Sequence, residues 1–78
     1  MIMDTNKFVE NFAEQFDETD PSEITIETSF RDIDEWCSLI ALSIIAMVDE
    51  AYKVKLTGDD IRNSKTIEDI FNIVKEKI

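Results

Sequence analysis

The sequence contains no histidine and only one cysteine, one glycine and one proline among its 78 residues. Without histidine, neither a Ser–His nor a Cys–His catalytic pair can form within the chain. Cys37 alone cannot form an internal disulfide, and it leaves a tetrahedral zinc site without its usual ligands. Chains this poor in glycine and proline have few tight turns. These absences predict an all-α fold with no catalytic residues and no metal ligands.

Positive charge is also scarce, because 8 lysines and arginines face 18 aspartates and glutamates and leave a net charge of −10. Such a surface repels phosphates, so we expect no nucleic-acid partner. It favours partners with basic patches. The chain lacks a basic start followed by a long apolar run, which predicts neither a signal peptide nor a membrane span. The lone cysteine suits a reducing compartment, and we expect a cytoplasmic monomer.

A chain of 78 residues has room for one domain, spanning 1–78, and buries only about 60% of its unfolded surface. A deep catalytic cleft does not fit beside a core of this size, so we do not expect an enzyme. Asp32 and Asp34 have the spacing that opens a calcium loop. Trp36 and Cys37, however, occupy the positions where such a loop needs an oxygen ligand and a glycine. The sequence therefore predicts no calcium site.

Apolar residues at helical spacing predict three main helices and one short helix. The first helix runs from about Asp4 to Phe16, because Phe8, Phe12 and Phe16 recur every four residues. It must end before Pro21, since the residue preceding a proline disfavours helical backbone angles.

The second helix is expected from Ser38 to Tyr52 and is apolar on almost every side. A domain this small cannot bury such a helix completely, which predicts an exposed apolar face for a partner. The short helix is expected at Asp59–Asn63. The last helix starts at Thr66, which has capping-box spacing to Asp69. Its predicted apolar stripe consists of Ile67, Ile70, Phe71, Val74 and Ile78.

Between Asp17 and Cys37 the helical periodicity is lost. Ile24 and Ile26 alternate with polar neighbours, as in a strand, but the sequence offers no second strand to pair with. We therefore predict a long ordered loop that packs Ile24, Ile26 and Phe30 into the core.

Ser38 stands where this loop ends and the apolar helix begins. The free N–H groups and partial positive charge of a helix N-terminus suit a phosphate, so the serine oxygen could carry a phosphodiester. Serine is also a favoured N-cap residue, and capping is the simpler explanation of its position. The residue pattern leaves both interpretations open.

The residues from Phe30 onward combine a loop phenylalanine, a serine–leucine pair, acidic helix residues, an aromatic residue, a short helix and a threonine that opens the last helix. These are Phe30, Ser38-Leu39, Asp49-Glu50, Tyr52, Asp59-Asp60-Ile61 and Thr66-Ile67. Over nearly its whole length the chain resembles the acyl carrier protein family, in its discrete bacterial acyl or peptidyl carrier form. The resemblance implies a four-helix acyl-carrier-like bundle with a long loop after the first helix.

The resemblance further implies that a phosphopantetheinyl transferase attaches 4′-phosphopantetheine to the Ser38 hydroxyl. The thiol of that arm would hold an acyl or aminoacyl group as a thioester. Its partners would be an acyl- or aminoacyl-loading ligase and acyl-transfer enzymes with basic patches, in lipid or secondary-metabolite biosynthesis. Ile44 and Val48 would line an acyl pocket. The implied partner-binding residues are Leu39, Leu42, Ala46, Asp49, Glu50, Asp34 and Glu35.

Cys37 departs from the family, which has aspartate before the serine. An aspartate there would cap the helix, a contribution of about 1 kcal/mol, and the family's transferase uses it. Three interpretations follow: less efficient modification, an altered residue, or either a thiol with its own role or a chain that is not modified at all. The last keeps an alternative function open, an unmodified helical module that binds a partner through the apolar face of the second helix.

Overall fold

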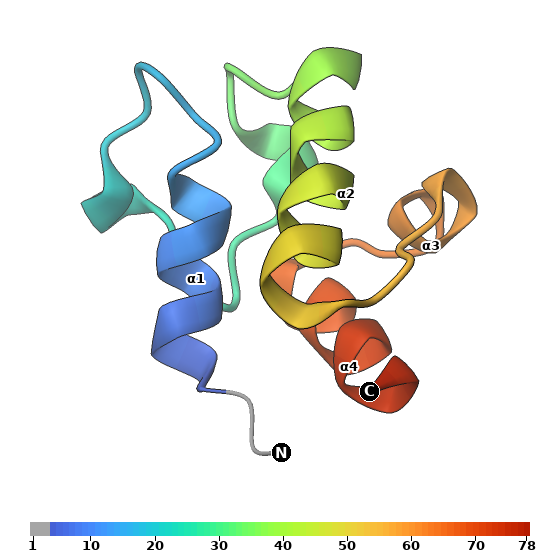
Figure 1. The fold of residues 1–78 in the computed structure, drawn as a ribbon. Helices are drawn as coiled ribbons and strands as arrows, with labels where there is room; N and C mark the ends of the chain where they lie inside the picture. The colour runs from blue at the N-terminus through green and yellow to red at the C-terminus, as the bar shows by residue number, and fades with distance from the viewer. Residues whose placement is uncertain (1–3) are drawn as a thin grey trace.

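The structure is a computed structural model that describes residues 4–78 (Figure 1). Over these residues the chain is all-α, as predicted, and the only β-type pairing is an isolated bridge between Ser29 and Thr66. Two short 3₁₀ turns, Pro21–Glu23 and Phe30–Asp32, lie in the long loop. The α-helices are α1 (Thr5–Ala13), α2 (Ser38–Tyr52), α3 (Gly58–Arg62) and α4 (Ile67–Lys77).

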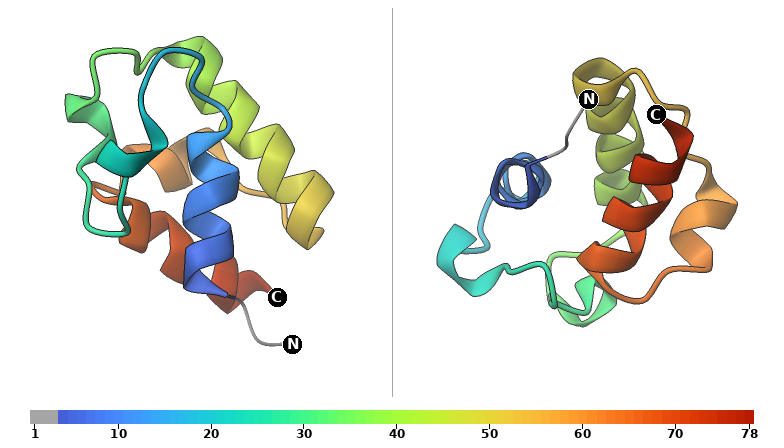
Figure 2. Two further views of the ribbon diagram at one scale, coloured as in Figure 1. Left: turned by 90° about the vertical axis from the view of Figure 1, so that its left-hand side faces the viewer. Right: turned by 90° about the horizontal axis from the view of Figure 1, so that it is seen from below.

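The helices are arranged around α2 and α4. Helices α1 and α3 each contact both of them, from opposite sides (Figures 1 and 2). The long loop between α1 and α2 crosses the end of the molecule at which α2 begins (Figure 1). The start of α2 is therefore flanked by the loop and by α3.

Helix α1 is shorter than predicted. Asp4 caps it, because its side chain accepts hydrogen bonds from the backbone N–H groups of residues 6 and 7. The helix ends at Ala13, and the N–H of Phe16 bonds to the Ala13 carbonyl at 3.0 Å in a tighter turn. That turn still directs Phe16 into the core beside Phe8 and Phe12, so the aromatic stripe extends beyond the helix that was predicted to contain it.

The long loop is ordered by its apolar residues and by its backbone. Ile24 and Phe30 are buried and Ile26 is half-buried against the same core, as the sequence predicted. The carbonyl oxygens of Ile26 and Thr28 accept hydrogen bonds of 2.8 and 3.1 Å from N–H groups at the start of α4. Loop carbonyls thus satisfy donors that a helix N-terminus leaves free.

Helix α4 has the predicted capping box. The Thr66 hydroxyl accepts from the N–H of Asp69, and the Asp69 carboxylate accepts from the N–H of Thr66. Ile78 does not continue the apolar stripe, since it follows the helix and is 51% exposed. The predicted stripe residues that are buried are Ile67, Ile70, Phe71 and Val74.

Helix α3 has only five residues, fewer than an isolated helix needs to be stable. It occupies Gly58–Arg62, one residue earlier than predicted. Its N-terminus has a second capping box, between Thr57 and Asp60. The Lys77 ammonium at the end of α4 lies 2.6 Å from the Asp60 carboxylate and secures the same end. Lys77 of α4 thus binds a neighbouring helix.

Arg31, from the loop, secures the other end of α3. Its guanidinium donates hydrogen bonds to the carbonyl oxygens of Ser64, Ile61 and Arg62 at 2.6, 2.8 and 2.9 Å. The same group lies 5.0 Å from the centre of the buried Phe30 ring, within cation–π range. One side chain therefore joins the loop before α2 to the C-terminus of α3.

Replacing Arg31 should destabilise the protein far more than replacing the other arginine. We expect Arg31→Met to lower the free energy of unfolding in urea by about 1.5–3 kcal/mol, because three carbonyls lose a charged donor. Arg62→Met removes only an exposed pair with Asp59 and should cost less than about 1 kcal/mol. Equal losses of unfolding free energy in the two variants would contradict a stabilising role for the three Arg31 hydrogen bonds.

Candidate functional site

Ser38 is the first residue of α2 and is exposed. The residue at the N-cap is Cys37, whose extended backbone precedes the helix and whose side chain makes no capping hydrogen bond. The capping explanation for Ser38 is therefore wrong, because the serine lies one position inside the helix. A long helix with no side-chain cap leaves N–H groups of its first turn free beside the serine.

A groove opens beside Ser38, between the first half of α2, helix α3 and the loop before α2. Its walls are predominantly apolar, and arginine side chains lie among them. Its lining residues are Arg31, Trp36, Cys37, Ser38, Ala41, Leu42, Ile45, Gly58, Ile61 and Arg62. The sequence predicted Ser38 and Leu42 as functional residues but missed the rest of this groove.

The predicted acyl-pocket residues Ile44 and Val48 lie in the core, where neither has any exposed surface. The α2 side chains that line the groove instead include Ala41 and Ile45. Ile45 and Ile44 are indistinguishable as residue types, and only the rotation of the helix against its neighbours assigns one to the core and the other to the groove.

The predicted partner residues on α2 share one face. Leu39 and Leu42 are 71% and 62% exposed, which is unusual for leucine. Ala46, about one helical turn after Leu42, is exposed as well. Asp49 and Glu50 continue this face at the C-terminal end of the helix and are exposed. The predicted exposed apolar face therefore exists and ends in carboxylates.

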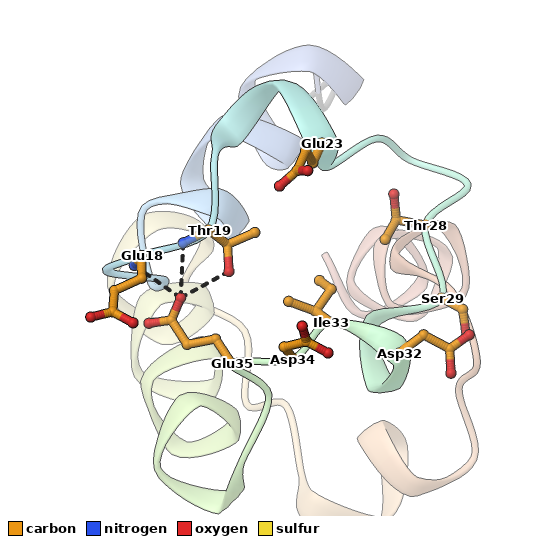
Figure 3. Close-up of a pocket in the computed structure, with 9 residues that line it drawn as sticks. All are labelled: Glu18, Thr19, Glu23, Thr28, Ser29, Asp32, Ile33, Asp34 and Glu35. Carbon is orange, nitrogen blue, oxygen red and sulfur yellow. Dashed lines mark hydrogen bonds between the residues drawn. The ribbon is translucent and has the colours of Figure 1, made fainter.

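Asp34 is exposed, but Glu35 has an internal role that the sequence did not reveal. Its carboxylate accepts a hydrogen bond from the N–H group of Asp17 at 2.6 Å. It also accepts from the N–H groups of Glu18 and Thr19, both at 3.0 Å, and from the Thr19 hydroxyl at 2.8 Å (Figure 3). Burial opposes the charge of Glu35, but these hydrogen bonds outweigh it and lower the pKa of the carboxyl below its ordinary value. Glu35 thus ties the start of the long loop to its end.

A second, acidic groove lies beside Glu35 (Figure 3). It is lined by the carboxylates of Glu18, Glu23, Asp32, Asp34 and Glu35. Within residues 4–78, no group of three or more cysteine, aspartate or glutamate side chains is arranged to hold a metal ion. The same described stretch contains no helix that is both long and apolar enough to cross a membrane.

Comparisons of the chain with protein-family models, with curated proteins and with solved structures returned no match.

Because the Cys37 side chain makes no capping hydrogen bond, a better N-cap residue at this position should stabilise the protein. We expect Cys37→Asp to raise the free energy of unfolding by about 1 kcal/mol, because a carboxylate accepts from free N–H groups of the first turn and suits the helix dipole. Urea unfolding of Cys37→Asp beside Cys37→Ala measures this, since alanine offers no acceptor. Equal stability of the two variants would contradict it.

The hydrogen bonds that the Glu35 carboxylate accepts should make the stability of the protein depend on pH. A carboxyl whose pKa is lowered by folding stabilises the protein above its unfolded pKa, and that contribution is lost as the pH falls through the folded pKa. Glu35→Gln should therefore lower Tm at pH 7, and the difference from the natural protein should shrink below about pH 4.5. The control is Glu27→Gln, an exposed carboxylate of the same loop. A Tm difference that is constant from pH 7 to pH 3 would refute the stabilising role of the ionised Glu35 carboxylate.

Proposed function

We propose that this chain is a carrier protein that holds an acyl or aminoacyl group as a thioester on a 4′-phosphopantetheine arm attached to Ser38. The observation that carries the proposal is the position of Ser38: exposed, first in a long uncapped helix, and at the mouth of a mostly apolar groove. The all-α arrangement with a long ordered loop before that helix is what an acyl-carrier-like bundle requires.

Attachment needs a transferase and coenzyme A as the donor. The Ser38 oxygen attacks the phosphorus that bears the pantetheine, and a new oxygen–phosphorus bond forms. The bond from that phosphorus to adenosine 3′,5′-bisphosphate breaks, and the serine proton is released. The product phosphodiester carries a negative charge at the start of α2, where free N–H groups and the helix dipole favour an anion.

The exposed face of α2 supplies a docking surface for the enzymes that load and unload the arm. Leu39 and Leu42 offer apolar area next to the attachment point. Asp49 and Glu50 at the far end of the face, and Asp34 at the near end, attract basic partners. Such charges act mainly on the rate of encounter, and salt weakens their effect.

The alternative function, an unmodified interaction module, draws on the same exposed leucines and on Cys37. A protein that only binds a partner through α2 needs neither a free serine hydroxyl nor a groove beside it. The two functions therefore differ in whether Ser38 accepts the arm.

The test is to incubate the purified chain with coenzyme A and a broad-specificity phosphopantetheinyl transferase. Intact and peptide masses should show one phosphopantetheine on the peptide containing Ser38, and none in Ser38→Ala. Cys37→Asp should be modified at least as fast, because it restores the residue that the family's transferase uses.

Modification of Cys37→Asp alone would mean that the natural chain is a poor substrate. No adduct on either version would refute the carrier proposal and favour the interaction module. Ser43→Ala provides the matched control, since it removes another hydroxyl of α2, one turn further along and outside the groove.

A further inference from the structure

The groove beside Ser38 differs in charge from the rest of the protein. The chain has two arginines, Arg31 and Arg62, and both line this groove. Among its lining residues within 4–78 there is no aspartate or glutamate, although the chain carries 18 of them. The groove is thus lined by basic but not by acidic residues, in a protein with a net charge of −10.

The charge of Arg31 is not neutralised by a partner. Its three hydrogen bonds all go to carbonyl oxygens, and no carboxylate of the described part of the chain lies within ion-pair distance of it. A guanidinium has five N–H donors, so two remain for a ligand. Arg62 pairs with Asp59 on the same short helix, an exposed pair that a better-placed anion can replace.

The rest of the groove is suited to a hydrocarbon chain. Trp36 and Ile45 contribute apolar surface, and Ile61 does so from α3. Gly58 also lines the groove, and a Cβ added there would have only the Arg62 guanidinium as a neighbour, at 4.0 Å. The groove thus offers an apolar path that starts at Ser38 and has guanidinium groups on the wall formed with α3.

We infer that the cargo of this carrier is an acyl group that ends in a carboxylate, the half-thioester of a dicarboxylic acid, with its acid group bound by Arg31 and Arg62. The inference rests on the proposed function, because the cargo reaches the groove only from an arm on Ser38. The arm's own phosphodiester is bonded to Ser38 itself, at the start of α2. The arginine that lacks an ionic partner is bound to the C-terminal end of α3.

The experiment compares two cargoes of equal carbon number, glutaryl and pentanoyl, transferred with the arm from glutaryl- and pentanoyl-coenzyme A. The rate of thioester cleavage by hydroxylamine is followed by intact mass and divided by the rate for the free coenzyme A thioester. Glutaryl should be protected about two- to fivefold more than pentanoyl, the effect of an exposed ion pair. The extra protection should vanish in 1 M salt.

Two variants test whether the arginines bind the cargo carboxylate, and both keep the hydrogen bonds of Arg31 to α3. Arg62→Gln should lose most of the extra protection of glutaryl, whereas Lys65→Gln removes the same charge from outside the groove and should retain it. In ¹H–¹⁵N spectra, the Arg31 Nε–H signal should shift when glutaryl is loaded and stay in place when pentanoyl is loaded.

Other outcomes overturn the inference in distinguishable ways. Equal protection of both cargoes on a modified Ser38 overturns the inference and leaves the carrier function standing. An Arg31 signal that shifts on attachment of the unloaded arm, with no further change on glutaryl loading, assigns the arginines to the phosphodiester and also overturns it. Failure of both the natural chain and its Cys37→Asp version to accept either arm overturns the inference together with the carrier function, and where only Cys37→Asp is modified the two cargoes are compared on that version.

Discussion

The hydrogen bonds from the Arg31 guanidinium to the end of α3 are the interaction on which the site depends. Helix α3 is too short to hold its own position, and it forms one wall of the groove beside Ser38. The opposite wall belongs to α2, whose start is fixed by the loop that carries Arg31. One side chain, stacked on the buried ring of Phe30, therefore sets both walls relative to the core. The Arg31 guanidinium therefore has two roles, because it holds α3 in place and also brings a positive charge to the groove.

Periodic features of the structure were predictable from the sequence. The position of α2 and the capping box at Thr66 follow from runs of apolar residues and from the hydrogen-bonding needs of helix ends. The exposed apolar face of α2 was predictable as well, because a small domain cannot cover a helix that is apolar on every side. Each of these depends on residues close in sequence, for which local rules are sufficient.

The features that could not be predicted depend on contacts between residues far apart in sequence. Arg31 and Ser64, and Glu35 and Asp17, meet only in the folded chain, and single polar residues leave no periodic signal. The choice of Ile45 over Ile44 for the groove depends on the rotation of α2. Lys53, the residue after α2, has a left-handed backbone conformation that glycine usually takes, and a lysine does not predict this conformation. The proposed carrier function and the assignment of Ser38 as its attachment site both rest on the resemblance, because position alone left Ser38 open between a helix cap and a phosphodiester site.

The location of Ser38 one residue inside α2 has a consequence for the energetics of the molecule. Had the serine been the N-cap, a substituent on its oxygen would have removed the acceptor that starts the helix, and every attachment or release would have changed the stability of the fold. With Cys37 at the cap, the serine oxygen takes no part in starting the helix. Attachment of the proposed arm would therefore cost the helix no capping acceptor, and the negative charge of the phosphodiester would instead favour the start of α2.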